Sequence, residues 1–116
     1  MKYYDQKNFY DLILTLLIVF NSPAYSLDTS SKSLEKYTKK ISNKFTRTFC
    51  NTTQFGISYE GALAFAIGET NKEFKNNKLN KLIDYSLLKN SIVNGLENNC
   101  QIYDFPISSL EKLEFD

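Results

Sequence analysis

The stretch Ser33–Cys50, SLEKYTKKISNKFTRTFC, decides the fold that the sequence predicts. Its apolar side chains recur at steps of three and four residues, at Leu34, Tyr37, Ile41, Phe45 and Phe49. Residues three and four apart share one face of an α-helix, so this spacing places a continuous apolar stripe on a helix. We therefore predict a helix over Ser33–Cys50 that turns this stripe towards a core.

The opposite face of the same predicted helix is basic. It carries a ladder of cationic side chains at three- and four-residue spacing: Lys32, Lys36, Lys40, Lys44 and Arg47. One interpretation is an ordinary solvated face. The other is a face that contacts anionic lipid headgroups or an acidic protein surface. The net charge of the chain is only +1, and we expect no nucleic-acid partner.

Two more helices are predicted after this stretch. Asn51–Gly56 breaks the apolar period and indicates a loop, after which Ser58 is a suitable N-cap for a helix over Ser58–Phe74. Gly61 and Gly68 share a small-residue face of that helix, which predicts close approach by a neighbouring helix and a central position in the fold. A third helix is expected over Asn80–Asn99, with an inner face of Leu82, Ile83, Leu87, Val93 and Leu96.

The C-terminal stretch predicts a short final helix. Ser108 and Glu111 have the spacing of a capping box, and Leu110, Leu113 and Phe115 supply apolar side chains after it. The predicted fold class is therefore all-α. It is a small antiparallel three-helix bundle with a short C-terminal helix, formed by residues 27–116 and preceded by a signal peptide.

The signal peptide is predicted over residues 1–26. A nine-residue apolar run, Leu12–Phe20, is followed by Pro23 and by small residues in Ala24-x-Ser26, the layout of a cleavage site. The run is too short for a good membrane span, which needs about 20 apolar residues. We favour cleavage after Ser26 over an uncleaved anchor or a buried segment. The chain is thus expected to be exported, to a periplasm or thylakoid lumen or outside the cell.

The two cysteines, Cys50 and Cys100, both fall in the predicted exported part. An even number of cysteines in an oxidising compartment favours a disulfide. Short loops would make the helices alternate in direction, which brings the ends of the first and third helices together. A bridge there would stabilise the fold by about 4 kcal/mol. Two free thiols, or a redox-active pair, are the alternatives.

The sequence contains no histidine, which excludes histidine-based nucleophilic and general-base catalysis and histidine-ligated metals. Two cysteines alone do not make a zinc site. Glu69 and Glu73 lie one helical turn apart, but with lysines beside them they are interpreted as surface carboxylates. We expect no enzyme activity, no cofactor and no metal.

One set of residues resembles a known protein group. It consists of Phe49-Cys50, Gly56-Ile57-Ser58, Glu60, Ala62-Leu63, Phe65-Ala66, Gly68-Glu69, Phe74 and Cys100. The pattern is similar to that of small uncharacterised secreted proteins of marine picocyanobacteria. The resemblance implies a periplasmic or lumenal location and no particular activity.

Three functional hypotheses follow from the sequence, of which the weakest is an enzyme with a carboxylate, tyrosine or lysine mechanism, since no set of residues indicates one. The first is an exported accessory or interaction protein that docks on a larger protein or an anionic membrane surface, through its basic helix or its aromatic tail. The alternative is a carrier that holds a small apolar ligand between its helices, which predicts an enclosed apolar cavity.

Overall fold

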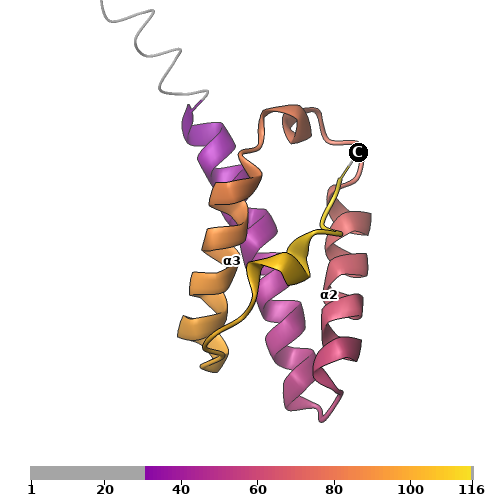
Figure 1. The fold of residues 1–116 in the computed structure, drawn as a ribbon. Coiled ribbons are helices and arrows are strands. Elements are labelled where there is room, and N and C mark those ends of the chain that lie inside the picture. The colour runs from indigo at the N-terminus through magenta and orange to yellow at the C-terminus, as the bar shows by residue number, and fades with distance from the viewer. Residues whose placement is uncertain (1–30, 116) are drawn as a thin grey trace, which may run out of the picture. The chain divides into compact units, whose positions relative to one another are not determined.

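The computed structural model describes residues 31–115, of which residues 34–115 belong to one unit. Within the described residues the ordered elements are all helical, as predicted. A helix described over residues 31–54, here called helix 31–54, is followed by α2 (Tyr59–Phe74), the 3₁₀ helix η1 (Lys78–Leu82), α3 (Tyr85–Cys100) and the 3₁₀ helix η2 (Ile107–Leu110) (Figure 1). The predicted signal peptide, residues 1–26, lies outside the described residues.

Helix 31–54 supplies several large apolar side chains to the core. Ile41, Phe45 and Phe49 are fully buried, and Tyr37 is buried beside them. The apolar stripe predicted from Ser33–Cys50 is thus the inner face of this helix. It packs against buried side chains from the rest of the unit, chiefly Ala62, Ala66, Phe74, Leu88, Ile92, Leu96, Phe105, Leu110, Leu113 and Phe115.

Helix 31–54 runs four residues past its predicted end, so the loop predicted from Asn51 was placed too early. Thr52 Oγ1 donates a hydrogen bond of 2.6 Å to the Thr48 carbonyl, and Thr53 Oγ1 donates one of 2.9 Å to the Cys50 carbonyl. These side-chain bonds satisfy the polar groups that favoured a loop prediction. The turn comes instead at Gly56, whose φ of +89° is open to glycine at little cost.

α2 begins as predicted and packs differently from the prediction. Ser58 caps it, with its side-chain oxygen accepting from the Gly61 amide at 3.2 Å. Its most buried face is formed by Ala62, Ala66, Thr70 and Phe74. Gly68 is exposed, and a side chain there would meet no atom within 4 Å. The prediction that Gly68 admits a neighbouring helix is therefore wrong.

The close approach occurs instead at Gly95 in α3. A Cβ atom at this position would lie 2.7 Å from Thr46 Oγ1 and 3.3 Å from Thr46 Cγ2. Thr46 is buried in helix 31–54, and its hydroxyl has no hydrogen-bond partner among residues 31–115. The two helices can therefore approach here because residue 95 lacks a side chain.

Substitution of Gly95 by alanine should destabilise the protein by about 1 kcal/mol, since the overlap with Thr46 outweighs the better helix propensity. In a Thr46→Ala background the nearest remaining contact is an ordinary 3.5 Å, and Gly95→Ala should then stabilise by up to about 1 kcal/mol. Gly68→Ala, at an open position, is the matched control and should also stabilise. Urea unfolding of the four variants measures each effect, and the same sign for Gly95→Ala in both backgrounds would contradict the packing account.

The third predicted helix is divided in two. Asp84 caps α3 by accepting hydrogen bonds from the amides of Ser86 and Leu87 at 3.0 and 3.3 Å, which separates α3 from η1. This break turns Leu82 and Leu87 outward, where they are 64% and 63% exposed. The inner face of α3 is Leu88, Ile92 and Leu96, so the predicted inward positions of Leu82 and Leu87 are wrong.

Asn80 joins three segments in the interior. Its Oδ1 accepts a 2.6 Å hydrogen bond from the Tyr37 hydroxyl. Its Nδ2 lies 2.9 Å from the Phe74 carbonyl and 3.2 Å from the Phe115 carbonyl, donating to both. Asn80 is only 4% exposed. It thereby ties helix 31–54, the end of α2 and the C-terminal segment together.

The buried Tyr37 hydroxyl makes the stability of the unit depend on pH in the alkaline range. Burial, and secondarily the nearby Tyr85, raises the pKa of Tyr37 above its ordinary value. Neutral Tyr37 therefore stabilises the fold fully below about pH 10, where unfolded tyrosine ionises, and this stabilisation is lost as the pH rises further.

We expect the free energy of unfolding to fall more steeply for the native protein than for Tyr37→Phe above about pH 10. Urea titrations between about pH 8 and about pH 11 bracket the ordinary tyrosine pKa and measure the two slopes. Parallel curves for the two proteins would show that Tyr37 does not carry this effect.

The C-terminal segment covers the core without the predicted capping box. η2 is preceded by Pro106, and no side chain caps it. The predicted apolar residues Leu110, Leu113 and Phe115 are nonetheless buried. Asn71 of α2 fixes the segment, since its Nδ2 donates to the Lys112 carbonyl and its Oδ1 accepts from the Glu114 amide, both at 3.1 Å.

Candidate interaction surface

A disulfide fastens the end of α3 to helix 31–54. Cys50 and Cys100 are bonded, with their Cα atoms 5.7 Å apart, so the predicted disulfide is present. Two further contacts lie along the same pair of helices. The Ser91 hydroxyl is 3.0 Å from that of Ser42, and Gly95 lies against Thr46. The bridge thus continues a contact line that holds the C-terminal part of helix 31–54 in place.

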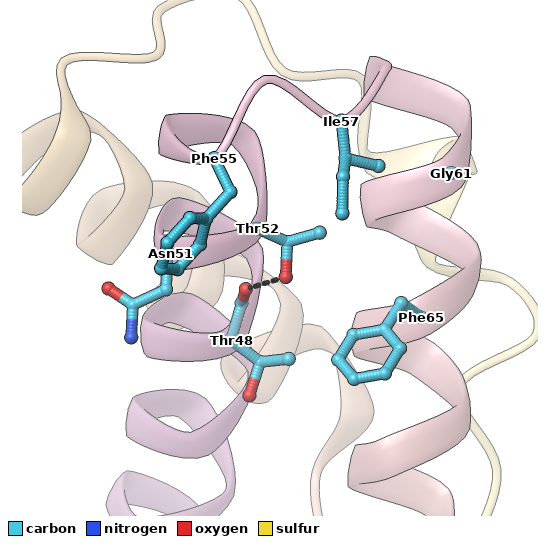
Figure 2. A pocket seen from close by; sticks show the side chains of 7 residues that line it. All are labelled: Thr48, Asn51, Thr52, Phe55, Ile57, Gly61 and Phe65. Carbon is cyan, nitrogen blue, oxygen red and sulfur yellow. Dashed lines mark hydrogen bonds between the residues drawn. The ribbon is translucent and has the colours of Figure 1, made fainter.

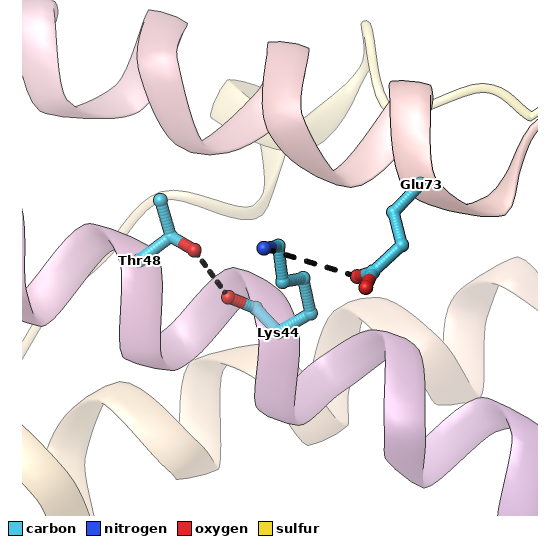
Figure 3. A network of polar contacts seen from close by, with 3 residues as sticks. All are labelled: Lys44, Thr48 and Glu73. Atoms are coloured by element: carbon cyan, nitrogen blue, oxygen red, sulfur yellow. Dashed lines mark hydrogen bonds and ion pairs between the residues drawn. The ribbon is translucent and has the colours of Figure 1, made fainter.

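The basic ladder of helix 31–54 lies outside this contact line, with Arg47 bordering it in a pocket that also contains Cys50 and Asn99. Lys36, Lys40 and Arg47 are exposed, and Lys32 is exposed in the short stretch before the unit begins. Lys44 is 34% exposed, and its ammonium group lies 3.9 Å from a carboxylate oxygen of Glu73 in α2 (Figure 3). An ion pair this exposed contributes little to stability. Three of the four ladder residues that lie within the unit therefore present their charge to solvent.

An apolar groove lies where helix 31–54 meets the start of α2. It has a volume of about 580 Å³ and is lined by Thr48, Asn51, Thr52, Phe55, Ile57, Gly61 and Phe65 (Figure 2). Phe55 is 86% exposed, Ile57 49% and Phe65 51%. These three large apolar side chains come from the interhelical connection and from α2 and gather around one hollow. Water covers most of their surface, which is typical of an interaction site rather than of a core.

The local fold holds this groove open. The Gly56 turn and the Ser58 cap fix the connection between the two helices. At the start of α2, the ring of Tyr59 packs edge-on against buried Phe49 with centroids 5.5 Å apart, and lies tilted at 45° to Phe105 at 5.9 Å. Phe55 and Ile57, on the connection, stay exposed. The start of α2 is therefore anchored to the core while the connection presents its apolar side chains to solvent.

The groove adjoins the basic ladder. Asn51 lines the groove and also a small polar pocket that it shares with Arg47, Asn43, Cys50, Gln54 and Asn99. Successive helix residues are about 100° apart, so Lys36, Lys40, Lys44, Arg47 and Asn51 fall within a sector of about 80° on helix 31–54. We call this sector, together with Phe55, Ile57 and Phe65, the basic–apolar face.

Sequence reasoning identified the basic half of this face and missed the apolar half. Phe55 and Ile57 flank Gly56 in a short connection between two helices. A large apolar side chain has little to pack against in such a connection, and that placement is the signal that could have identified them. Phe65 lies among alanines and glycines that predict close helix packing, so the sequence gives no signal that its side chain is exposed.

The remaining candidate features are less informative. A second groove of about 500 Å³ lies between α2 and η2. Its two large apolar side chains, Leu63 and Ile67, are only partly exposed, and the rest of its lining is small or charged: Glu60, Ala64, Gly68, Ser108, Ser109, Glu111 and Lys112. Glu73, one of the two carboxylates considered in the sequence, pairs with Lys44. Among residues 31–115 no cluster of three or more metal-ligating side chains is present.

No protein-family model, no curated protein and no solved structure matches this chain. The resemblance to secreted picocyanobacterial proteins therefore stays a prediction. The case for function rests on the geometry and chemistry of the basic–apolar face.

Proposed function

We propose that this chain is an exported accessory protein that acts by binding, and that the basic–apolar face is its binding surface. In this proposal residues 1–26 are removed as a signal peptide, and residues 27–116 fold as an antiparallel three-helix bundle in a periplasm, a thylakoid lumen or the extracellular space. The Cys50–Cys100 disulfide supports the proposal, because such bonds persist in oxidising compartments. Over residues 31–115, no helix combines the length and the apolar character that a membrane crossing requires.

The observation that carries the proposal is the exposure of Phe55, Ile57 and Phe65 around one groove. Exposure of large apolar side chains to water is unfavourable, and a bound partner would remove that surface from water. The same exposure favours surface binding over the alternative, a carrier of a small apolar ligand. Carriers enclose most of their ligand, whereas a ligand in this groove would remain partly in water.

Comparative affinity purification tests the proposal. The protein would be tagged in its source cell, and the proteins and lipids retained by the native form would be compared with those retained by Phe55→Ser and Ile107→Ser. Ile107 is 47% exposed in η2, which borders α2 across a second groove that shares no lining residue with the first, and is the matched control. We expect a partner that is lost with Phe55→Ser and kept with Ile107→Ser.

If the Phe55→Ser variant retains the same proteins and lipids as the native form, this face is not the binding surface. The mass of the recovered native protein tests export in the same preparation. A start near Leu27 supports removal of the leader, and recovery of intact residues 1–26 on exported protein would contradict it.

A further inference from the structure

We propose that the partner of the basic–apolar face is the surface of an anionic lipid bilayer, with the basic residues at the lipid phosphates and Phe55, Ile57 and Phe65 inserted among the upper parts of the acyl chains. This inference rests on the proposed function and names the partner. It is carried by the charge, the apolar exposure and the arrangement of the two along one helix.

The charge of the face suits an anionic surface. Lys36, Lys40 and Arg47 are exposed and have no ion-pair partner among residues 34–115, while Lys44 shares its charge with Glu73. The one acidic residue described in helix 31–54, Glu35, falls outside the sector of about 80° that holds these cations. From Lys36 to Arg47 the cations extend for about 16 Å along the helix axis. Clusters of basic residues on one helix face are typical of binding to anionic headgroups.

The apolar residues are placed to enter the bilayer interface. Phe55 is almost free of protein contact at 86% exposure and follows the last turn of the basic helix. Ile57 and Phe65 flank the same groove. Amphipathic surfaces of this kind place aromatic and aliphatic side chains about 5–10 Å into the boundary between headgroups and acyl chains. Because Asn51 borders both the groove and the Arg47 pocket, both halves of the face can contact one membrane surface.

The protrusion of Phe55 favours lipid over an acidic protein. The anchors of protein–protein interfaces are aromatic residues and arginine seated in close-fitting pockets. Here the aromatic side chain of Phe55 is 86% exposed and protrudes. A fluid bilayer needs no shape-matched pocket for such a side chain. An acidic protein partner is therefore the competing outcome of the test.

Vesicle co-sedimentation tests the inference. The oxidised protein, as purified from the producing cell and with both ends defined by intact mass, is mixed with vesicles of phosphatidylcholine alone or of phosphatidylcholine with phosphatidylglycerol. We expect binding to the mixed vesicles only, weakened by added salt. Each basic side chain should contribute about fivefold, so Lys40→Gln combined with Arg47→Gln should weaken binding about 25-fold. Phe55→Ser should weaken it about tenfold, through lost apolar burial.

The matched controls lie around η2 and should not affect partitioning. Lys112→Gln removes an exposed charge and Ile107→Ser an exposed apolar side chain, both away from the groove between helix 31–54 and α2. All variants share one N-terminus, so any contribution of the leader cancels. These five substitutions, carried by four variants, change exposed side chains, and thermal unfolding of each variant verifies that it is folded.

The outcomes separate the two proposals. Loss of vesicle binding in the two face variants, with binding kept in the controls, supports a lipid partner. Absence of vesicle binding, together with a protein captured in a Phe55-dependent way, overturns the lipid inference and leaves the proposed function standing. Vesicle binding that is unchanged in Phe55→Ser and in the combined Lys40→Gln and Arg47→Gln variant overturns the lipid inference as well. If neither lipid nor protein depends on Phe55, both proposals fail.

Discussion

Reduction of the Cys50–Cys100 bond is expected to lower the free energy of unfolding by about 4 kcal/mol. The bond joins residues 50 positions apart, and opening a loop of that size restores about this much conformational entropy to the unfolded chain. A domain of this size has only about 5–10 kcal/mol of stability to lose. A 4 kcal/mol loss in such a domain corresponds to a fall in Tm of about 15–30 °C.

Urea unfolding of the oxidised protein and of the Cys50→Ala/Cys100→Ala variant measures this effect. A second preparation, reduced and alkylated, shows whether the result depends on how the bond was removed. Unchanged stability in both preparations would mean that the bond does not stabilise the fold. The free-thiol and redox interpretations of the two cysteines would then gain support.

Substitution of Asn80 by alanine is expected to cost about 3 kcal/mol, the second largest effect we predict. The change leaves the buried Tyr37 hydroxyl and the buried Phe74 carbonyl without this hydrogen-bond partner. It also removes one of two hydrogen bonds to the Phe115 carbonyl, which still accepts from the Asn76 amide at 3.3 Å. A buried polar group without a partner costs about 1–3 kcal/mol, and small shifts or entering water relieve part of the total.

Asn90→Ala is the matched control for this prediction. Asn90 is exposed in α3, so its substitution should change the free energy of unfolding by less than about 0.5 kcal/mol. Chemical denaturation of both variants makes the comparison. Equal effects at the two positions would show that the buried hydrogen bonds of Asn80 do not tie the three segments together.

The sequence predicts those parts of the fold that depend on local pattern. The spacing from Leu34 to Phe49 predicts the helix and its buried face because helical period and burial coincide there. Ser58 is predicted as a cap because the cap is a local contact. The disulfide is predicted because cysteine number and compartment limit the possible pairings.

The failed predictions concern contacts between distant segments. Gly68 and Gly95 are equivalent in sequence terms, and only the packed structure shows that Gly95 meets Thr46 while Gly68 meets nothing. The role of Asn80 depends on Tyr37 and on a carbonyl 35 residues later. Leu82 and Leu87 fit a helical period, yet the local hydrogen bonds of Asp84 begin a new helix and turn them outward.

The sequence predicts the basic half of the candidate site and not the apolar half, again because only the first depends on a local pattern. A charged ladder on a helix is visible as a pattern, and its exposure follows from the burial of the opposite face. An apolar side chain such as Phe55 is ordinarily assigned to a core. Its exposure becomes evident only when the position of the turn at Gly56 is known.

Tryptophan fluorescence at position 55 tests the central claim, that the basic–apolar face is the membrane-binding surface, most directly. The native sequence has no tryptophan, so Phe55→Trp introduces a single reporter in the groove, and Ile107→Trp introduces one in η2. On addition of vesicles that contain phosphatidylglycerol, the account predicts a blue shift and quenching by brominated lipids for Trp at position 55, and neither change at position 107. A shift at position 107 with none at position 55 would contradict it.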